Sequence, residues 1–379
     1  MKTLSVLKNS VVAWGDLLLE VYLDKDNQPF DYYLGGIGNA ARILSLWYDR
    51  VVLPVPFSQF YNVLEHTGAR TKADFCRTLH LNPDVIQFVL IEDVYASLPL
   101  RIYQNSGFLY RHNLVEYAYI EGEHPGYAID SVNRESLHEV AASIAMNLSS
   151  YSSIFDTVSY LCGYGEGSYD LYIEAHYPFS WVQHVNECSP QPSPYRLYLD
   201  SRHPEAMVET FKSLSSVVQP VWKMNRVEAN TMGVVQTMRD SESNVRITVH
   251  TPPLRYLAGF DLFLTWGPLG SGYVAIPSDI DQQADRKITI RTITPMPSYH
   301  VDPTGSGDAF FGTYAGATAH GDAFEVATRK ASAAGALACN KVGSRELTLF
   351  EIEECAYAYG LTPCPSMLLK LPEERIVYE

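Results

Sequence analysis

The segment that most constrains the fold is VDPTGSGDAFFG, residues 301–312, in which a glycine turn leads directly into an apolar stretch. Gly305 and Gly307 tolerate backbone angles that other residues adopt only at a cost, so the turn can aim successive N–H groups at one point. The residues that follow mix small and large apolar side chains, as in a helix packed closely against a neighbour. A glycine turn at a helix N-terminus is typical of a phosphate site, because unpaired N–H groups and the helix dipole both favour negative charge.

Asp308 is unusual in this setting, because a carboxylate at the mouth of an anion site would repel a phosphate. The local sequence leaves two interpretations open. Asp308 is the N-cap that ends an ordinary turn, or it is a base that takes a proton from a hydroxyl while the amides hold the charge that leaves on the other side. The rest of the chain must decide between them.

Composition limits the classes of partner. The 379 residues, 46% of them hydrophobic, suffice for one large domain or two ordinary ones. The formal net charge of -15 disfavours nonspecific attraction to nucleic acid or anionic membranes, so we expect neither partner. The six cysteines form no CxxC pair, and the first apolar run contains Asp16 and Glu20 without a cleavage-like ending. We therefore expect a cytoplasmic protein with reduced thiols and no signal peptide or membrane span.

Strands, hairpins and one helix are predicted in the N-terminal part of the chain. Residues 10–14 have the pattern of a buried strand, and a hairpin is expected from 17–23 and 30–34. The glycines before Asn39 then open a predicted helix. Further strands and a second hairpin are expected at 51–55, 85–91, 98–103 and 107–110. Arg101 lies in the second hairpin, where it either clamps an anionic substrate group or is merely solvated.

From about residue 130 helix-like and strand-like pieces alternate, which favours βα units around a largely parallel sheet. Helices are predicted at 136–148 and 204–214, and strands at 158–162, 197–199, 217–224 and 260–265. The strand at 197–199 ends at Asp200, with Arg202 close behind.

Asn225 and Glu228 follow one of these strands at a spacing with two interpretations. An amide and a carboxylate three residues apart can organise a hydrated Mg²⁺ beside phosphates. The same spacing is that of a helix capping box. Residues 267–272, GPLGSG, resemble the first half of a P-loop but lack its Lys-Ser/Thr ending.

Taken in order, these landmarks resemble the ribokinase (PfkB) family of carbohydrate and nucleoside kinases. They are a Gly-Asp after the first strand, glycines and an asparagine before the first helix, a mid-chain strand ending in aspartate with an arginine, Asn-x-x-Glu, a Thr-x-Gly-x-x-Gly loop and Asp-x-Thr-Gly-Ser-Gly-Asp-Ala-Phe. They span residues 10 to 345. The resemblance implies a single α/β domain over 1–379, a three-layer α/β/α architecture with a mostly parallel central sheet and a small β-sheet lid made of segments 17–34 and 90–115.

The family also implies roles for single residues. By this resemblance Asp308 is the catalytic base, with the amides of Gly305, Ser306 and Gly307 as anion hole. The other implied contacts are Asp16, Gly36 and Asn39 to the substrate; Asn225, Glu228, Thr265, Gly267 and Gly270 to the nucleotide; Glu228 to Mg²⁺ through water; and Asp302 and Thr304 to a monovalent cation such as K⁺.

The implied activity is ATP-dependent phosphorylation of a hydroxymethyl group on a small sugar-like substrate. Two alternatives stay open, a nucleoside kinase and a non-catalytic, kinase-like nucleotide-binding or scaffold protein. The second alternative is motivated by departures on the substrate side, where Gly35-Gly36 lies closer to Asn39 than the family spacing and Pro54–Ser58 replaces a usual Gly and Asp. A homodimer through the lid is a further expectation.

Overall fold

The structure is a computed structural model. It describes residues 10–91, 98–105, 112–120, 139–148, 169–175, 196–215, 220–239, 245–249, 254–280, 290–296, 298, 303–340, 347–361 and 375–378.

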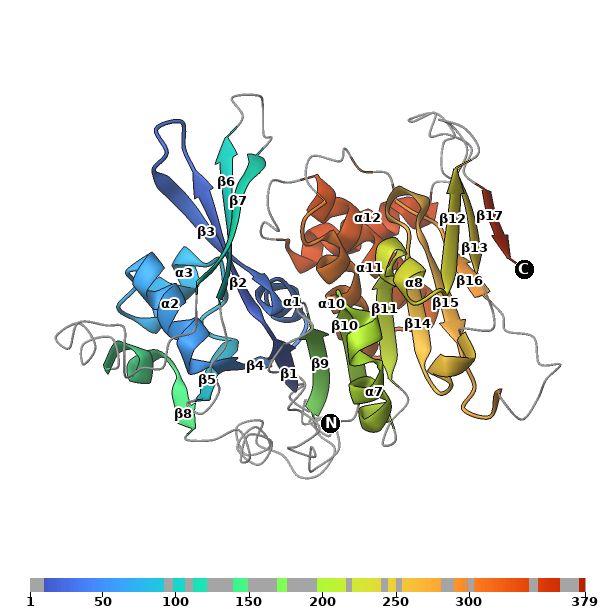
Figure 1. Cartoon of the computed structure of the whole chain (residues 1–379), viewed down its shortest axis with the longest axis horizontal. Helices are drawn as coiled ribbons and strands as arrows, with labels where there is room; N and C mark the ends of the chain where they lie inside the picture. The colour runs from blue at the N-terminus through green and yellow to red at the C-terminus, as the bar shows by residue number, and fades with distance from the viewer. Residues whose placement is uncertain are drawn as a thin grey trace, which may run out of the picture.

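A ten-stranded sheet forms the centre of the molecule, in the order β16-β15-β14-β11-β10-β9-β1-β4-β5-β8 (Figure 1). The strands from β14 to β8 pair in parallel, and β15 and β16 add antiparallel at one edge. Their bounds are β1 (Ser10–Gly15), β4 (Arg50–Pro56), β5 (Ile86–Ile91), β8 (Met146–Leu148), β9 (Tyr169–Ala175), β10 (Arg196–Ser201), β11 (Val221–Asn225), β14 (Asp261–Thr265), β15 (Ser271–Ala275) and β16 (Ile290–Ile293).

Helices cover both faces of this sheet, which confirms the predicted α/β/α layers. Side chains of β1 alternate between the two faces: Val11 and Ala13 join one core, whereas Val12 and Trp14 join the other. The first core contains residues of α1 (Ile37–Leu44), α2 (Phe57–Thr67), α3 (Lys72–Thr78), α10 (Ser306–Ala319), α11 (Phe324–Cys339) and α12 (Leu349–Leu361). The second core contains residues of α7 (Pro204–Ser215) and α8 (Arg226–Thr231).

The small residues of α10 allow it to approach α1 closely. A Cβ placed on Gly316 would lie 2.1 Å from Cγ of Trp47, and one on Gly312 would lie 3.0 Å from Cγ2 of Ile43. Both glycines are therefore required by close packing, as the mixture of small and large residues in the sequence predicted. This contact fixes the N-terminus of α10 relative to the helix that carries Asn39.

A separate four-stranded sheet, here called the small sheet, has the order β3-β2-β6-β7 and projects from the main sheet (Figure 1). It consists of β2 (Leu17–Leu23), β3 (Pro29–Gly36), β6 (Leu98–Asn105) and β7 (His112–Ile120). These strands overlap the expected segments 17–34 and 90–115, but β3 extends to Gly36 and β7 to Ile120, and a lid role for the sheet stays a prediction. The arm predicted at 107–110 lies outside the described residues.

One part of the structure was not predicted, and one prediction was wrong. The third sheet, β12 (Val235–Arg239), β13 (Val245–Val249) and β17 (Arg375–Tyr378), was not expected. The helix predicted to run to Leu148 ends earlier, because residues 146–148 form β8 and pair with β5. The strand predicted at 158–162 lies outside the described residues, and a single domain over 1–379 stays a prediction. In the part of the chain that the structure describes, no helix is long and apolar enough to cross a membrane.

Candidate active site

Three charged residues form a row across the carboxyl end of the main sheet. The strand register places Glu174 of β9 beside Asp200 of β10, and Asp200 beside Lys223 of β11. Their neighbours Ile173, Leu199 and Trp222 point into the core on the α7 side, so the alternation of a strand directs the charged side chains toward α10. All three are nearly inaccessible to solvent.

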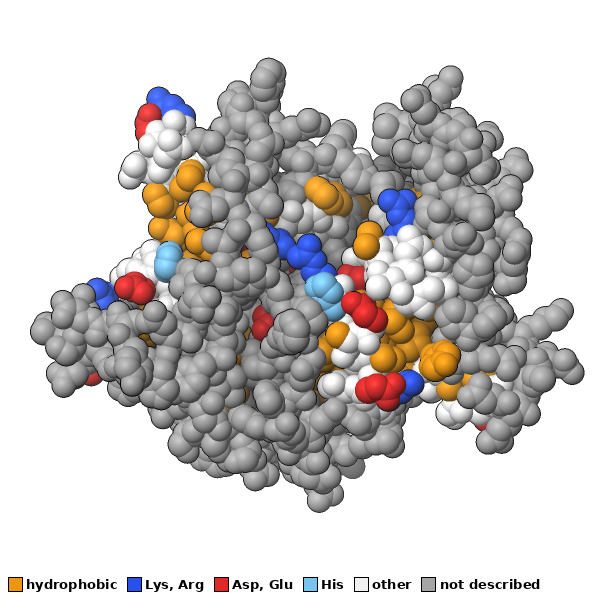
Figure 2. All heavy atoms as spheres, in the orientation of Figure 1, with side chains coloured by type: hydrophobic (Ala, Val, Ile, Leu, Met, Phe, Trp, Pro, Cys, Tyr) orange, Lys and Arg blue, Asp and Glu red, His pale blue; other side chains and the backbone are white. Residues whose placement is uncertain are grey.

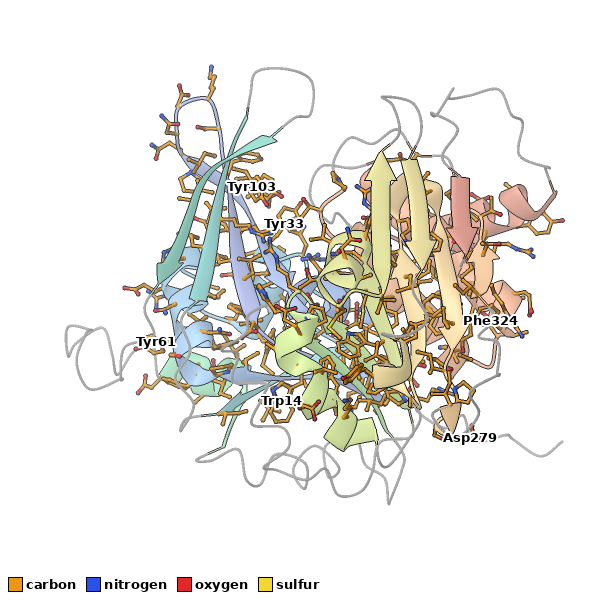
Figure 3. The ribbon with its side chains drawn as sticks, turned by 45° about the vertical axis from the view of Figure 1, so that its right-hand side comes forward. Trp14, Tyr33, Tyr61, Tyr103, Asp279 and Phe324 are labelled. Atoms are coloured by element: carbon orange, nitrogen blue, oxygen red, sulfur yellow. The ribbon has the colours of Figure 1, made fainter. Side chains whose placement is uncertain are left out.

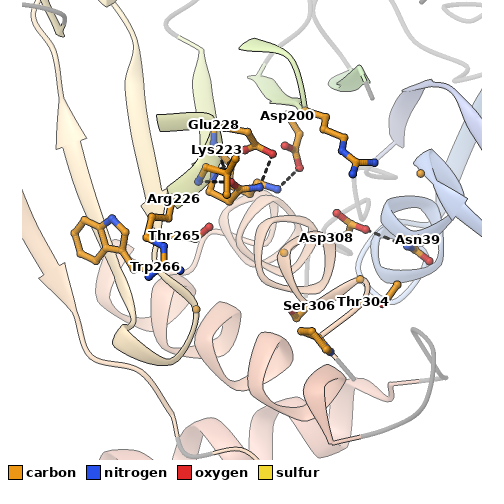
Figure 4. Close-up of a pocket in the computed structure, with 18 of the residues that line it drawn as sticks. Asn39, Asp200, Lys223, Arg226, Glu228, Thr265, Trp266, Thr304, Ser306 and Asp308 are labelled. Carbon is orange, nitrogen blue, oxygen red and sulfur yellow. Dashed lines mark hydrogen bonds and ion pairs between the residues drawn. The ribbon is translucent and has the colours of Figure 1, made fainter. Parts of the chain in front are cut away.

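Lys223 and Asp200 form a buried ion pair, with 2.5 Å between Nζ and Oδ2 (Figure 4). Burial lowers the pKa of Lys223, but the carboxylates of Asp200, Glu228 and Asp308 outweigh it and hold that pKa well above its usual range. Lys223 is therefore a permanent cation. Burial raises the pKa of Asp200 to about 7, against the opposing effect of the Lys223 charge.

Glu174 lies at the end of β9, close to other acids. Burial, followed by the negative charges of Asp308 and Asp200, raises its pKa well above the usual range, and Lys223 opposes this only in part. The main-chain oxygen of Glu174 also packs against Gly15, where a Cβ would lie within 2.3 Å of it. Glu174 thus favours the protonated form, beside the ion pair of Asp200 and Lys223.

The N-terminus of α10 lies next to the row of Glu174, Asp200 and Lys223. Its N-cap is Gly305, which has φ 75°, a left-handed conformation that glycine adopts without strain. The Ser306 N–H donates to the Pro303 carbonyl at 3.1 Å, whereas the N–H groups of Gly307 and Asp308 have no acceptor among the described residues. A Cβ on Gly307 would lie 3.2 Å from Nζ of Lys223. Free amides, the positive end of the helix and a lysine ammonium therefore meet at one point.

Asp308 is not the N-cap of α10, so the simple capping interpretation is wrong. It occupies the first turn, its side chain caps nothing, and its Oδ2 accepts a hydrogen bond from Nδ2 of Asn39 at 3.1 Å (Figure 4). Asn39 comes from α1, so two distant parts of the sequence meet here.

Arg42 fixes the amide of Asn39. Its Nη1 donates to Oδ1 of Asn39 at 3.1 Å, which leaves the NH₂ group of that amide facing Asp308. The same guanidinium donates to the carbonyls of Leu34, Leu79 and His80, so it is held from several sides. The carboxylate of Asp308 is consequently oriented by a chain of buried groups.

These groups open onto a cavity of about 720 Å³ between the small sheet and the main sheet. Asn39, Gly36 and Asp308 line one side together with Leu18, Glu20 and Arg101 from the small sheet. The other side is lined by Asn225, Arg226, Val227, Glu228, Thr265, Trp266, Gly267 and Leu269, and the middle by Asp200, Arg202, Lys223, Pro303, Thr304, Gly305, Ser306 and Gly307. Figure 2 shows Lys and Arg side chains gathered between the small sheet and the main sheet.

Asn225 and Glu228 form a complete capping box at the start of α8. The carboxylate of Glu228 accepts from the main-chain N–H of Asn225 at 2.6 Å and from its Nδ2 at 2.5 Å. Oδ1 of Asn225 accepts in return from Val227 and Glu228. The capping interpretation is confirmed, and both residues also line the cavity.

Three residues implied by the resemblance are not placed in the cavity wall. Asp16 is buried below it, where its main-chain oxygen accepts from the N–H of Ile37 at 3.1 Å. Gly270 lies beside it and is required by packing, since a Cβ there would be 2.3 Å from the Ile293 carbonyl oxygen. Asp302 lies outside the described residues, whereas Thr304 is in the wall.

Sequence reasoning did not single out Lys223, Glu174 or Arg42. A signal existed for the first two, because each is a charged residue next to large apolar residues in a strand of the central sheet, VWKMN and YDLYIEA. A charge at such a position must have a buried partner or a function. Among the described residues no group of three or more His, Cys, Asp or Glu side chains is placed to hold a metal ion.

The C-terminal part of the chain matches a known family. Residues 286–349 match the model of the pfkB family carbohydrate kinase, a segment that contains the glycine turn and α10. No curated protein sequence matches the chain.

Solved structures show the same fold over almost the whole chain. A putative ribokinase from Agrobacterium tumefaciens is 17% identical, with a TM-score of 0.54, covering 93% of this chain and 98% of its own. Phosphofructokinase-2 from Escherichia coli in complex with potassium is 14% identical (TM-score 0.51, coverage 93% and 99%). A nucleoside kinase from Methanocaldococcus jannaschii, an archaeal member of the ribokinase family, is 12% identical (TM-score 0.51, coverage 93% and 99%). The predicted resemblance to the ribokinase/PfkB family and its α/β fold are confirmed.

Proposed function

We propose that the protein is an ATP-dependent kinase that phosphorylates a hydroxymethyl group of a small sugar or sugar-like substrate. The observation that carries the proposal is the meeting point at the start of α10. There, the amides of Gly307 and Asp308, which have no acceptor among the described residues, the ammonium of Lys223 and a carboxylate held by Asn39 all border one cavity. Kinases of matched family and fold support a carbohydrate or nucleoside kinase in general.

Asp308 acts as the base in this mechanism. Its Oδ2 is held by Asn39, so the carboxylate stays directed at the cavity and can accept the proton of an acceptor hydroxyl. As the hydroxyl oxygen of the acceptor attacks the γ-phosphorus of ATP in line, the bond from that phosphorus to the bridging β–γ oxygen breaks and ADP leaves. Positioning and charge stabilisation contribute most of the rate enhancement.

The amides of Gly307 and Asp308 would face the transferring phosphoryl group. Gly305 makes the turn that aims them, and the positive end of α10 adds to the same field. Lys223 supplies a full positive charge beside Gly307. The Ser306 amide plays no part in this hole, because it donates to Pro303.

The nucleotide would lie along the ends of β11 and β14. Asn225, Glu228, Thr265 and Gly267 line that side of the cavity, and the exposed Arg226 provides a positive charge there. Gly270 shapes the turn from outside the wall rather than through contact.

A Mg²⁺ ion fits this side only through water. Each oxygen of Glu228 accepts a hydrogen bond from Asn225, which holds the carboxylate in the cavity wall. Glu228 is therefore suited to orient water around an ion held by nucleotide phosphates, where the ion would neutralise their charge. A monovalent cation near Thr304 and Asp302 and a homodimer through the small sheet stay predictions, as does the cytoplasmic location.

The test is an ATP turnover screen over pentoses, hexoses, keto-deoxy acids and nucleosides, with product identified by mass. Asp308→Asn keeps the shape of the side chain and should lower kcat by about 10²-fold to 10⁴-fold, the usual contribution of a positioned general base. Asp84→Asn, the same change at an exposed position, is the matched control and should leave kcat unchanged.

Two results would contradict the proposal. Near wild-type turnover in Asp308→Asn would show that Asp308 is not the catalytic base. A chain that binds ATP but yields no phosphorylated product from any acceptor would instead be the non-catalytic nucleotide-binding protein. Phosphorylation of nucleosides alone would favour the nucleoside kinase alternative, for which the archaeal nucleoside kinase is a structural precedent.

A further inference from the structure

The wall of the cavity contributed by the small sheet contains a buried ion pair. Glu20 of β2 and Arg101 of β6 are register partners in adjacent parallel strands, so both side chains lie on the same face. Nη1 of Arg101 lies 3.5 Å from Oε1 of Glu20, and the side chains are 18% and 1% exposed. Both line the cavity that contains Asp308.

This face of the small sheet is built to admit the pair. Leu19 and Val21 on the opposite face belong to the apolar core, as an ordinary amphipathic strand requires. Gly35 leaves room for the carboxylate, because a Cβ there would lie 3.1 Å from Oε1 of Glu20. A buried ion pair contributes less stability than apolar residues of similar volume, so two charges here point to a use other than holding the sheet.

Aromatic rings close the same face beyond the pair. Tyr22 and Tyr103 stack at 4.9 Å, and Tyr33 packs edge-on against Tyr22 and stacks on His80. Figure 3 shows Tyr33 and Tyr103 on the side of the small sheet that faces the main sheet. The tyrosines pack on one another and none lines the described cavity, so the polar contacts on this wall come from Glu20 and Arg101.

The charges of this wall disfavour an anion placed directly beside it. The positive charge of Arg101 is already balanced by Glu20, and Asp308 adds a further negative charge across the cavity. A phosphate or carboxylate on the acceptor would approach two carboxylates and one compensated cation. A hydroxyl suits the wall, since it can accept from the partly exposed Arg101, whose charge is balanced by the buried Glu20 behind it.

We propose that Arg101, balanced and positioned by Glu20, is a hydroxyl-binding subsite, and that the acceptor is an uncharged polyol rather than a sugar phosphate or a sugar acid. The inference rests on the proposed kinase function and narrows its substrate class. Free sugars and nucleosides are both uncharged polyols, and the assay separates these two sources.

The experiment compares matched neutral and anionic acceptors. D-Fructose is set against D-fructose 6-phosphate and D-glucose against D-gluconate, with adenosine as the nucleoside arm. For each compound, kcat/KM is measured with ATP, and binding is measured by calorimetry in the presence of ADP. Wild-type protein should prefer the neutral member of each pair by at least about 10-fold, the discrimination expected from one charge-assisted hydrogen bond.

Two variants test the residues directly. Glu20→Gln leaves the Arg101 charge uncompensated, so binding of neutral acceptors should weaken by about 10-fold to 100-fold and the ratio of anionic to neutral affinity should rise. Glu20→Gln with Arg101→Gln restores neutrality and should return that ratio toward the wild-type value. Thermal unfolding of each variant verifies that the fold is kept, and the double variant keeps the test valid if the single one unfolds.

The assay separates failure of the proposed subsite from failure of the proposed kinase activity. Wild-type preference for fructose 6-phosphate or gluconate would overturn the subsite and leave the kinase intact. Binding of neutral acceptors without turnover would support the subsite and overturn the kinase. An unchanged anionic-to-neutral ratio in Glu20→Gln, or no binding of any acceptor, would also overturn the subsite.

Discussion

Lys223 offers the most direct test of the charge row, because its removal should affect stability and turnover in separable ways. Lys223→Met keeps the length of the side chain and removes the ammonium that pairs with Asp200 at 2.5 Å. Removing one partner of a buried ion pair leaves an uncompensated charge, which costs about 3–5 kcal/mol of unfolding free energy. Burial raises the pKa of Asp200 to about 7 even with Lys223 beside it, so without that ammonium the pKa should rise further and protonation should relieve part of the penalty at neutral pH.

The expected effect on turnover follows from Coulomb's law. A unit charge about 4 Å from the transferring phosphoryl group contributes roughly 4 kcal/mol at an effective dielectric constant of about 20. Asp200 on the other side of the ammonium cancels part of this contribution. We therefore expect kcat to fall by about 10²-fold, equivalent to roughly 2.7 kcal/mol.

The double variant Lys223→Met with Asp200→Asn separates the two effects. It removes both charges of the buried pair, so its free energy of unfolding in urea should recover most of the loss, whereas kcat should stay low. Lys212→Met is the matched control: Lys212 pairs with Glu209 on the surface of α7, and its loss should cost less than about 1 kcal/mol. Wild-type turnover in the double variant would refute a role for Lys223 at the phosphoryl group, and unchanged stability in the single variant would refute the buried pair.

Three further predictions concern packing, protonation and the metal. Gly316→Ala should lower the free energy of unfolding by at least about 1–3 kcal/mol through collision with Trp47, whereas Gly335→Ala, whose nearest atom would be 3.3 Å away, should change it by less than about 1 kcal/mol. The pKa of Glu174 is raised in the folded state, so its contribution to stability is fully present below the unfolded pKa and is lost as pH rises. Glu174→Gln should therefore gain stability relative to wild type between about pH 5 and 8 in urea unfolding, and a constant difference across that range would contradict the raised pKa. Glu228→Gln should raise the Mg²⁺ concentration for half-maximal turnover by roughly 10-fold, and an unchanged titration in a folded variant would restrict Glu228 to capping.

Elements with strong local patterns were predictable from the sequence. The strands at β1 and β14, the first hairpin and the helices α1 and α7 were all expected close to their observed bounds, because periodicity and turn residues specify them locally. The end of the helix before β8 was not, because residues 146–148 become a strand only through pairing with β5, far away in the sequence. Tertiary pairing overrode local propensity there.

The glycine turn and Asp308 could be assigned to a site from sequence, but their partners could not. Asn39 and Asp308 are separated by 269 positions, and no local pattern states that their side chains meet at 3.1 Å. The same holds for Lys223. Its closeness to Gly307 depends on the register of β11 with β10 and on the position of α10 against the sheet. The sequence identified the chemical groups, and the topology determined which of them touch.

The placement of charge explains how an acidic chain could hold ATP. The net charge of -15 repels polyanions at long range, so binding requires a local field. The start of α10, Lys223, Arg202 and Arg226 supply that field in the middle and on the β11 side of the cavity. On the small-sheet side Arg101 is instead balanced by Glu20. In the proposed reaction, ATP would thereby be held on the β11 side of the cavity and a hydroxyl-bearing acceptor on the small-sheet side, with the transferring phosphate and the acceptor hydroxyl meeting near Asp308. If positive charge is unbalanced only on the β11 side, raising the salt concentration should weaken ATP binding more than acceptor binding. Only ATP binding depends on that unbalanced charge.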